Sequence, residues 1–403
     1  MKIIPGGVCA AKGYRAGGIY CGIRKNPHKK DLALIVSENA ASTASVYTQN
    51  LVVGAPILVT RQNTQNGYAQ AIFCNSGNAN TCNANGVEIA ERMCALLEQH
   101  LNIPQHDVIV ASTGVIGKPL DIAPIEAGMG PLCASLGADS DAAAQAIMTT
   151  DTLLKQCAVE FELGGVPCRI GGIAKGSGMI HPNMATLLSF LTSDAAISPA
   201  MLQKALQTAV DETFNMVSID GDTSTNDMVS ILCNAQAQNA EIVCEDQAFH
   251  TFLNALKYVC LTLSQLIAKD GEGATKLLEC RVAGASDIPT ARTVAKSVIC
   301  SSLFKAAMFG ADANWGRVLC AIGYSGAQVD VNKIDVSFAS AAGRIDVCKN
   351  GSGLPFDETL AKRVLSQDEI VIDIALHSAD ANAIAWGCDL TYDYVRINGD
   401  YRS

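Results

Sequence analysis

Long hydrophobic runs are missing from this sequence. No apolar run approaches the roughly 18 uncharged residues of a membrane helix, and no apolar signal segment follows the charge near the N-terminus. Basic residues are also scarce, because 29 lysines and arginines stand against 39 acidic residues, for a net charge of −10. We therefore expect a cytoplasmic protein with neither nucleic acid nor membrane as a partner.

Motifs for metals, dinucleotides and nucleoside triphosphates are missing as well. The 16 cysteines are scattered singly without a C-x-x-C pair, and the six histidines lack metal-ligand spacing. No complete G-x-G-x-x-G follows a predicted strand, and no G-x-x-x-x-G-K-[ST] loop occurs. We expect no metal and no cofactor, and cysteines that are reduced and act as small hydrophobic side chains.

The chain is long enough to bury a large core. Its 403 residues, 49% of them hydrophobic, predict two domains, which we place at 1–275 and 276–403. Residues 1–30 suit a starting hairpin, and the aromatic and charged tail, 391–403, has the pattern of a docked terminal strand. Hydrophobic periodicity predicts strands over 32–36, 44–47, 69–75, 108–111, 159–163, 186–192, 228–237, 334–338 and 369–376, and helices over 86–101, 138–150, 199–214, 246–269 and 291–308.

A glycine-rich stretch runs into a buried strand between Gly171 and Phe190. The glycines can adopt backbone angles closed to other residues, and Thr186 stands where they give way to the strand. A hydroxyl placed there could attack the peptide bond after Ala185, and cleavage would give Thr186 a free α-amine that can act as a general base. The alternative is an ordinary turn into a strand, which the local pattern alone favours.

A second loop, 112–117, follows a short strand and reads Ser-Thr-Gly-Val-Ile-Gly. A hydroxyl and backbone N–H groups at a strand end can form an oxyanion hole, although a plain strand-to-helix turn has the same pattern. The acidic loop 220–227 lacks the spacing and the closing glutamate of a calcium-binding EF-hand. Glu272, between two glycines, is either an exposed turn residue or a group that points into a cleft.

Five segments in this order resemble the ornithine acetyltransferase family of arginine biosynthesis, also called glutamate N-acetyltransferase. The resemblance covers nearly the whole chain, and each segment alone would be weak support. The segments are 75–80, 112–117, 175–186, 220–227 and 309–317.

The resemblance implies a mixed α/β (α+β) fold, with a layered αββα sandwich of the N-terminal-nucleophile type and a smaller C-terminal α/β domain. It also implies self-cleavage between residues 185 and 186, which gives an α chain of 1–185 and a β chain of 186–403, with two copies of each in a heterotetramer. The implied roles are Thr186 as nucleophile and substrate-binding residue, Thr113 and Gly114 as oxyanion hole, and Thr150, Lys175, Glu272, Asn398 and Ser403 as further substrate-binding residues.

The resemblance further implies the reaction, in which acetyl passes from N2-acetyl-L-ornithine to L-glutamate through an acetyl-threonine intermediate. Acetyl-CoA is a possible second donor, as in the bifunctional members of the family. Two alternatives stay open, namely a self-processed aminopeptidase or amidohydrolase on a related scaffold, and a binding protein whose site has decayed.

Overall fold

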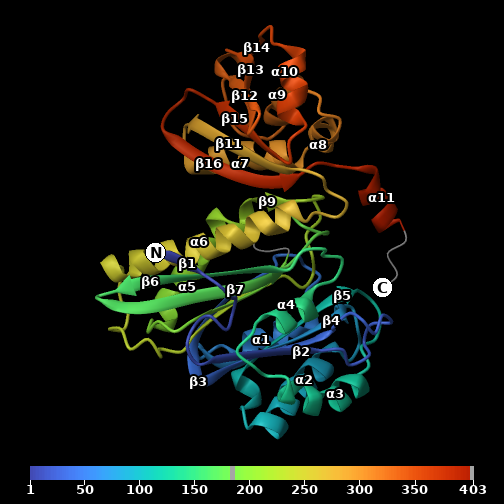
Figure 1. Cartoon of the computed structure of the whole chain (residues 1–403), viewed down its shortest axis with the longest axis vertical. Coiled ribbons are helices and arrows are strands. Elements are labelled where there is room, and N and C mark those ends of the chain that lie inside the picture. Colours follow the sequence, from blue (N-terminus) through green and yellow to red (C-terminus); the bar gives the residue numbers. More distant parts are fainter. Residues whose placement is uncertain (182–186, 400–403) are drawn as a thin grey trace.

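The computed structural model describes residues 1–181 and 187–399, and the fold is mixed α/β (Figure 1). The named strands, β1 to β16, all belong to two sheets, and helices cover the outer faces of these sheets. The helices of four or more residues are α1 (Ala55–Asn63), α2 (Gly86–Leu101), α3 (Ala123–Ala134), α4 (Asp141–Ile147), α5 (Pro199–Glu212), α6 (Gln247–Lys269), α7 (Ile288–Cys300), α8 (Ser302–Phe309), α9 (Trp315–Gly323), α10 (Glu358–Leu365) and α11 (Tyr392–Asn398).

The larger sheet has the strand order β1-β6-β7-β8-β10-β3-β4-β5, with β2 also paired to β3. The long strand β3 joins two halves of this sheet, because it pairs with β2 through residues 32–37 and with β10 through residues 42–47. The strands are β1 (Lys2–Ile4), β2 (Tyr14–Ile19), β3 (Leu32–Tyr47), β4 (Tyr68–Asn78), β5 (Val108–Val115), β6 (Lys155–Leu163), β7 (Val166–Lys175), β8 (Leu188–Ser193) and β10 (Met228–Cys233).

The two halves of the larger sheet face each other across a shared core. On β8, Leu188 and Phe190 lie in this central core, whereas Leu191 points the other way, into the core beneath α5 and α6. On the second half, Phe73 of β4 packs into a third core beneath α2 and α3, as the twofold alternation of a strand requires. The layers therefore run helix, sheet, sheet, helix, which is the predicted αββα sandwich.

The smaller sheet has the order β14-β13-β12-β15-β11-β16-β9 and lies beyond α6 (Figure 1). Helix α6 contacts β6 and β7 of the larger sheet and β11 and β16 of the smaller one, so one helix packs on both. The strands are β9 (Val217–Ser218), β11 (Leu277–Ala285), β12 (Asp335–Ser340), β13 (Gly343–Lys349), β14 (Ser352–Gly353), β15 (Glu369–Ala375) and β16 (Ala381–Cys388).

By length and composition, α6 is the one helix in the described part of the chain that could cross a membrane. Its apolar face is instead buried in the protein core, where Phe252 and Leu256 have no exposed surface. Its polar face carries Lys257, whose Nζ lies 2.7 Å from Glu212 Oε2 on α5. The helix therefore has the features of a core helix packed between two sheets.

The N-terminal prediction of a hairpin over residues 1–30 is wrong. Strand β1 pairs with β6 and strand β2 pairs with β3, so the two lie on separate halves of the larger sheet. The strands predicted over 32–36 and 44–47 form one continuous strand, β3, with a shift of register against β4 between Val36 and Ala41. An irregularity of this kind lets one strand bend and pair with strands in both halves of the larger sheet.

The helix predicted over 291–308 is two helices, because the chain turns at Ser301 between α7 and α8. The Ser301 side chain caps α8 by accepting a hydrogen bond from the backbone N–H of Phe304 at 3.2 Å. Serine is a favoured N-cap residue because its side-chain oxygen satisfies a backbone donor of the first helical turn.

The strand pattern predicted for the tail is wrong over residues 392–398, which form helix α11. Asp393 lies in the first turn and Arg396 in the last, 3.1 Å apart between their charged atoms, an order that complements the helix dipole. Seven residues of alternating aromatic and charged type are too few to separate a strand from a single exposed helix.

Candidate active site

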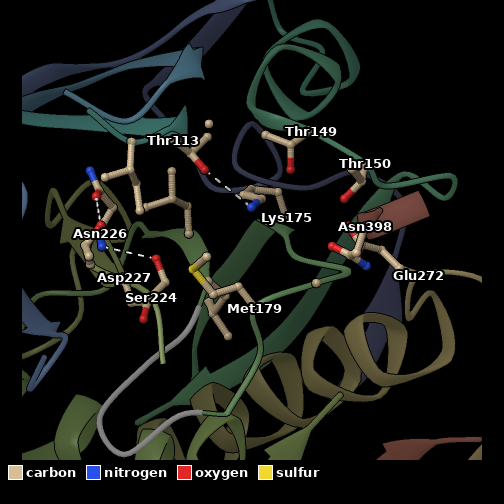
Figure 2. Close-up of a pocket in the computed structure, with 16 residues that line it drawn as sticks. Thr113, Thr149, Thr150, Lys175, Met179, Ser224, Asn226, Asp227, Glu272 and Asn398 are labelled. Atoms are coloured by element: carbon tan, nitrogen blue, oxygen red, sulfur yellow. Dashed lines mark hydrogen bonds between the residues drawn. The ribbon is translucent and has the colours of Figure 1, made fainter. Parts of the chain in front are cut away.

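One pocket gathers residues from both halves of the larger sheet, from loops beside them and from the C-terminal tail (Figure 2). Its volume is about 120 Å³, and Leu187, the first described residue after the predicted cleavage site, is among its lining residues. Ala185, Thr186 and Ser403 lie outside the described residues. The other predicted site residues all line this pocket, namely Thr113, Gly114, Thr150, Lys175, Glu272 and Asn398.

The predicted oxyanion pair stands at the end of β5. Gly114 has φ of +128°, and a Cβ atom there would lie 2.4 Å from the carbonyl carbon of Gly77 on β4. Only glycine allows this backbone angle and this close approach of two strands. Thr113 is nearly buried, and its Oγ1 accepts a hydrogen bond from Lys175 Nζ at 3.4 Å.

Lys175 ends β7 and reaches the pocket with its buried ammonium group. The next residue, Gly176, donates its backbone N–H to Asp151 Oδ1 at 2.7 Å. Burial would raise the pKa of Asp151, but the charges of Lys155 and Lys175, with this hydrogen bond, hold it well below the usual carboxyl value. Asp151 is therefore a fixed negative charge beside the pocket.

A buried ion network holds the loop that carries Thr150. Lys155 has no exposed surface, and its Nζ lies 2.7 Å from Asp151 and 2.5 Å from Asp270. Asp270 also accepts the backbone N–H of Thr152 at 3.0 Å. Asp151 also accepts the backbone N–H of Thr149 at 2.8 Å, so the network fixes the residues on both sides of Thr150. The Oγ1 atom of Thr150 lies 2.6 Å from Ser177 Oγ.

The tail completes one side of the pocket through Asn398, the last residue of α11. Its Nδ2 donates to Glu272 Oε2 at 2.6 Å, and the Glu272 backbone N–H donates to Ser177 at 2.8 Å. Gly178 lies so close that a Cβ atom there would be 2.3 Å from Glu272 Oε2. Glu272 is thus a nearly buried acid that points into the pocket, which decides between its two predicted alternatives.

The other side of the pocket is formed by Ser224, Asn226 and Asp227, opposite Thr150, Glu272 and Asn398, with Lys175 between the two groups (Figure 2). The sequence shows the acidic and polar loop but gives no sign that it faces a pocket. Asn226 Nδ2 donates to the carbonyl oxygen of Ser112 at 3.1 Å, which ties this loop to the end of β5.

The chain is anchored on both sides of residues 182–186. Before them, Asp220 accepts the backbone N–H groups of Met179 at 2.6 Å and Ile180 at 2.8 Å. After them, the Leu187 carbonyl accepts the backbone N–H of Met228 at 2.9 Å, and β8 continues beside β10. The described residues on either side of the predicted scissile bond, Ile180 and Leu187, are therefore both held by backbone hydrogen bonds.

Taken together, the described residues of the pocket supply the ammonium group of Lys175, the carboxyl group of Glu272 held by an amide, and a hydroxyl beside a glycine N–H. This set can bind a zwitterion and stabilise an oxyanion. Within residues 1–181 and 187–399, no group of three or more histidine, cysteine or acidic side chains has the arrangement of a metal site.

Comparisons with known proteins identify the family of this chain. Residues 15–403 match the profile of the ArgJ family. The arginine biosynthesis bifunctional protein ArgJ of Caldanaerobacter subterraneus subsp. tengcongensis is 48% identical over 405 residues, with 100% of each chain covered. Its counterpart in Bacillus subtilis is 44% identical over 402 residues, with 99% of this chain and 97% of that protein covered.

A solved structure adds a match in three dimensions. The crystal structure of the arginine biosynthesis bifunctional protein from Bacillus halodurans aligns with a TM-score of 0.51 at 46% sequence identity. The alignment covers 99% of that chain and 53% of this one. Matched along nearly its whole length by sequence, this chain belongs to the ArgJ family.

Proposed function

We propose that this chain is a glutamate N-acetyltransferase that moves the acetyl group of N2-acetyl-L-ornithine to L-glutamate in arginine biosynthesis. The observation that carries the proposal is the meeting of Thr113, Gly114, Lys175, Glu272 and Asn398 in one pocket beside Leu187. Family membership at 44–48% identity to bifunctional arginine-biosynthesis proteins supports it.

Thr186 is the proposed nucleophile, freed by cleavage after Ala185. A free α-amine ordinarily has a pKa of about 8, so a useful fraction is neutral near pH 7 and can take the hydroxyl proton. The hydroxyl attacks the acetyl carbonyl, and Thr113 Oγ1–H and Gly114 N–H stabilise the oxyanion that forms. Ornithine leaves, and the amino group of glutamate then attacks the acetyl ester.

The charged groups of the pocket suit amino-acid substrates. Lys175 would pair with a substrate carboxylate, and Glu272, oriented by Asn398, would accept a substrate ammonium group. Thr150 and Ser403 are proposed to add hydrogen bonds to the same substrates. Because both substrates use one site in turn, the kinetics should be ping-pong.

Self-cleavage is supported by the extent of the match to the Bacillus halodurans chain. That chain is covered almost completely, yet it corresponds to 53% of this one. The proposed β chain, residues 186–403, makes up 218 of 403 residues, or 54%. We further propose a heterotetramer of two α and two β chains in the cytoplasm, and acetyl-CoA as a second acetyl donor, as the word bifunctional in the relatives' names suggests.

The test is acetyl transfer by the purified protein. With N-acetylornithine and glutamate it should form ornithine and N-acetylglutamate, with parallel lines in double-reciprocal plots. Hydrolysis of N-acetylornithine at full rate without glutamate would instead indicate the amidohydrolase alternative, and absence of both reactions would contradict the proposal. A separate assay with acetyl-CoA and glutamate tests the second donor.

A further inference from the structure

The C-terminal helix α11 is docked on the protein through polar contacts. None of its seven residues is buried, and Tyr392 and Val395 are 84% and 68% exposed. Thr391, Tyr394 and Asn398 lie on one face, since they recur at intervals of three and four residues, and each side chain donates a hydrogen bond to the rest of the fold. A helix with so little buried surface depends on such bonds to stay in place.

Tyr394 lies in the middle of this face and ties the helix to a wall of the pocket. Its hydroxyl donates to Asp220 Oδ2 at 3.2 Å. The same carboxylate accepts the backbone N–H of Met179 at 2.6 Å, and Met179 lines the pocket with φ of +55°, an angle that a residue with a side chain adopts at a cost. The Asp220 carboxylate therefore joins the wall formed by Met179 to helix α11.

The loop that carries Glu272 fits closely against the start of the same helix. Thr391 is the N-cap residue, yet its hydroxyl donates to the Gly273 carbonyl at 2.7 Å instead of accepting a hydrogen bond from its own helix. A Cβ atom on Gly273 would lie 2.8 Å from the backbone nitrogen of Tyr394. A small movement of α11 therefore changes the surroundings of Glu272.

Asn398 lies one turn beyond Tyr394 and carries the contact that reaches the pocket (Figure 2). Its Nδ2 donates to Glu272 Oε2 at 2.6 Å and to the Tyr394 carbonyl at 3.1 Å, so the two residues are directly linked. A carboxylate has about four acceptor positions, and those that Asn398 leaves open can accept an ammonium group. The placement of α11 thus decides how Glu272 meets a substrate.

We infer that Tyr394 is a positioning residue for the side-chain ammonium group of N-acetylornithine, an inference that rests on the proposed function. Through its hydrogen bond to Asp220 it fixes α11, and it thereby holds Asn398 in place to orient Glu272. Tyr394 is not among the described residues that line the pocket, so it acts through Asn398. Burial and the charge of Asp220 raise the pKa of Tyr394 well above the usual tyrosine value, so its hydroxyl keeps the proton that it donates.

The first experiment removes the Tyr394 hydroxyl and keeps the ring. Tyr394→Phe should raise the KM for N-acetylornithine about tenfold and leave kcat within about threefold of wild type, because the lost contact serves binding and not the reacting carbonyl. In the reverse reaction, the KM for N-acetylglutamate should stay at the wild-type value, since this substrate has no ammonium group. Tyr392→Phe is the matched control on the same helix, where an exposed ring packs on Phe309, and it should keep every wild-type value.

A double variant tests whether Tyr394 acts through Asn398. Asn398→Ala should raise the KM for N-acetylornithine at least as much as Tyr394→Phe does. The double variant should have the KM of Asn398→Ala alone, because two residues that act on one contact are not additive. Effects that multiply in the double variant would overturn the inference. So would an unchanged KM in Tyr394→Phe, an equal rise in Tyr392→Phe, or an equal rise for N-acetylglutamate.

Limited proteolysis follows the docking of α11 without reference to activity. Trypsin cleaves after Arg396 when the helix opens, because proteolysis of a folded segment proceeds through its opened state. Mass spectrometry of the chain that ends at Arg396 should show cleavage about tenfold faster in Tyr394→Phe than in wild type or Tyr392→Phe. Equal rates in the three proteins would overturn the inference. If the wild type transfers no acetyl group, the proposed function fails, whereas the trypsin rates still show whether Tyr394 holds α11.

Discussion

Removal of one hydroxyl tests the proposed oxyanion hole. Thr113→Val deletes the proposed donor but keeps the shape and the strand preference of a residue at the end of β5. Loss of one oxyanion donor raises the barrier by about 2.7–4 kcal/mol, which is about 10²- to 10³-fold in kcat. KM should change little, because the hydroxyl acts on charge that develops only in the transition state.

The fold should tolerate this change. The contact from Lys175 to Thr113 is long, at 3.4 Å, and its loss should cost about 1 kcal/mol of stability. The assay is ornithine release at saturating N-acetylornithine and glutamate, with Tm measured in parallel. Thr113→Ser keeps the hydroxyl and should retain kcat within about tenfold of wild type, since the donor remains. A Thr113→Val enzyme that cleaves itself and keeps more than a tenth of wild-type kcat would refute the assignment.

Three further predictions concern the walls of the pocket. Gly178→Ala should raise KM about tenfold or more, because its Cβ would displace Glu272, and the substrate KM measures this. Lys155→Met leaves buried carboxylates unpaired and should lower the free energy of unfolding in urea by about 3–5 kcal/mol at pH 7. Since the folded pKa of Asp151 is depressed, that stabilisation is present above the usual carboxyl pKa and is lost as pH falls below it, so wild type and Lys155→Met should converge in acid. The folded pKa of Asp227 is raised, so its stabilisation is lost as pH rises, and Asp227→Asn should raise Tm at neutral pH. A Tm for Asp227→Asn that is lower at pH 7 than that of wild type would contradict this last expectation.

The sequence predicts the framework of this fold better than its connections. Strands such as β8 and helices such as α2 and α6 follow from hydrophobic periodicity, because their burial depends on local spacing. The pairing of β1 with β6 does not follow from periodicity, because it joins segments more than 150 residues apart. The helical tail is not predicted either, because Asn398 is held in part by its hydrogen bond to Glu272, which is 126 residues away in the chain.

The sequence likewise predicts some residues of the site and not others. Thr113, Gly114 and Lys175 were found through motifs that resemble a known family, and the structure brings them into one pocket. Lys155 is not predicted, because it precedes the strand predicted over 159–163 and a lysine is expected to be exposed. Its burial depends on Asp151, four residues earlier, and on Asp270, 115 residues later. Asp227 was part of a recognised loop, but only tertiary packing reveals that it is buried.

The central claim is that a threonine freed by cleavage of the chain carries the acetyl group. Mass spectrometry of protein mixed with N-acetylornithine and quenched in acid tests it most directly. The account predicts two chains of 185 and 218 residues, with one acetyl group on the peptide that begins at Thr186. An intact chain, or an acetyl group on any other residue, would contradict it.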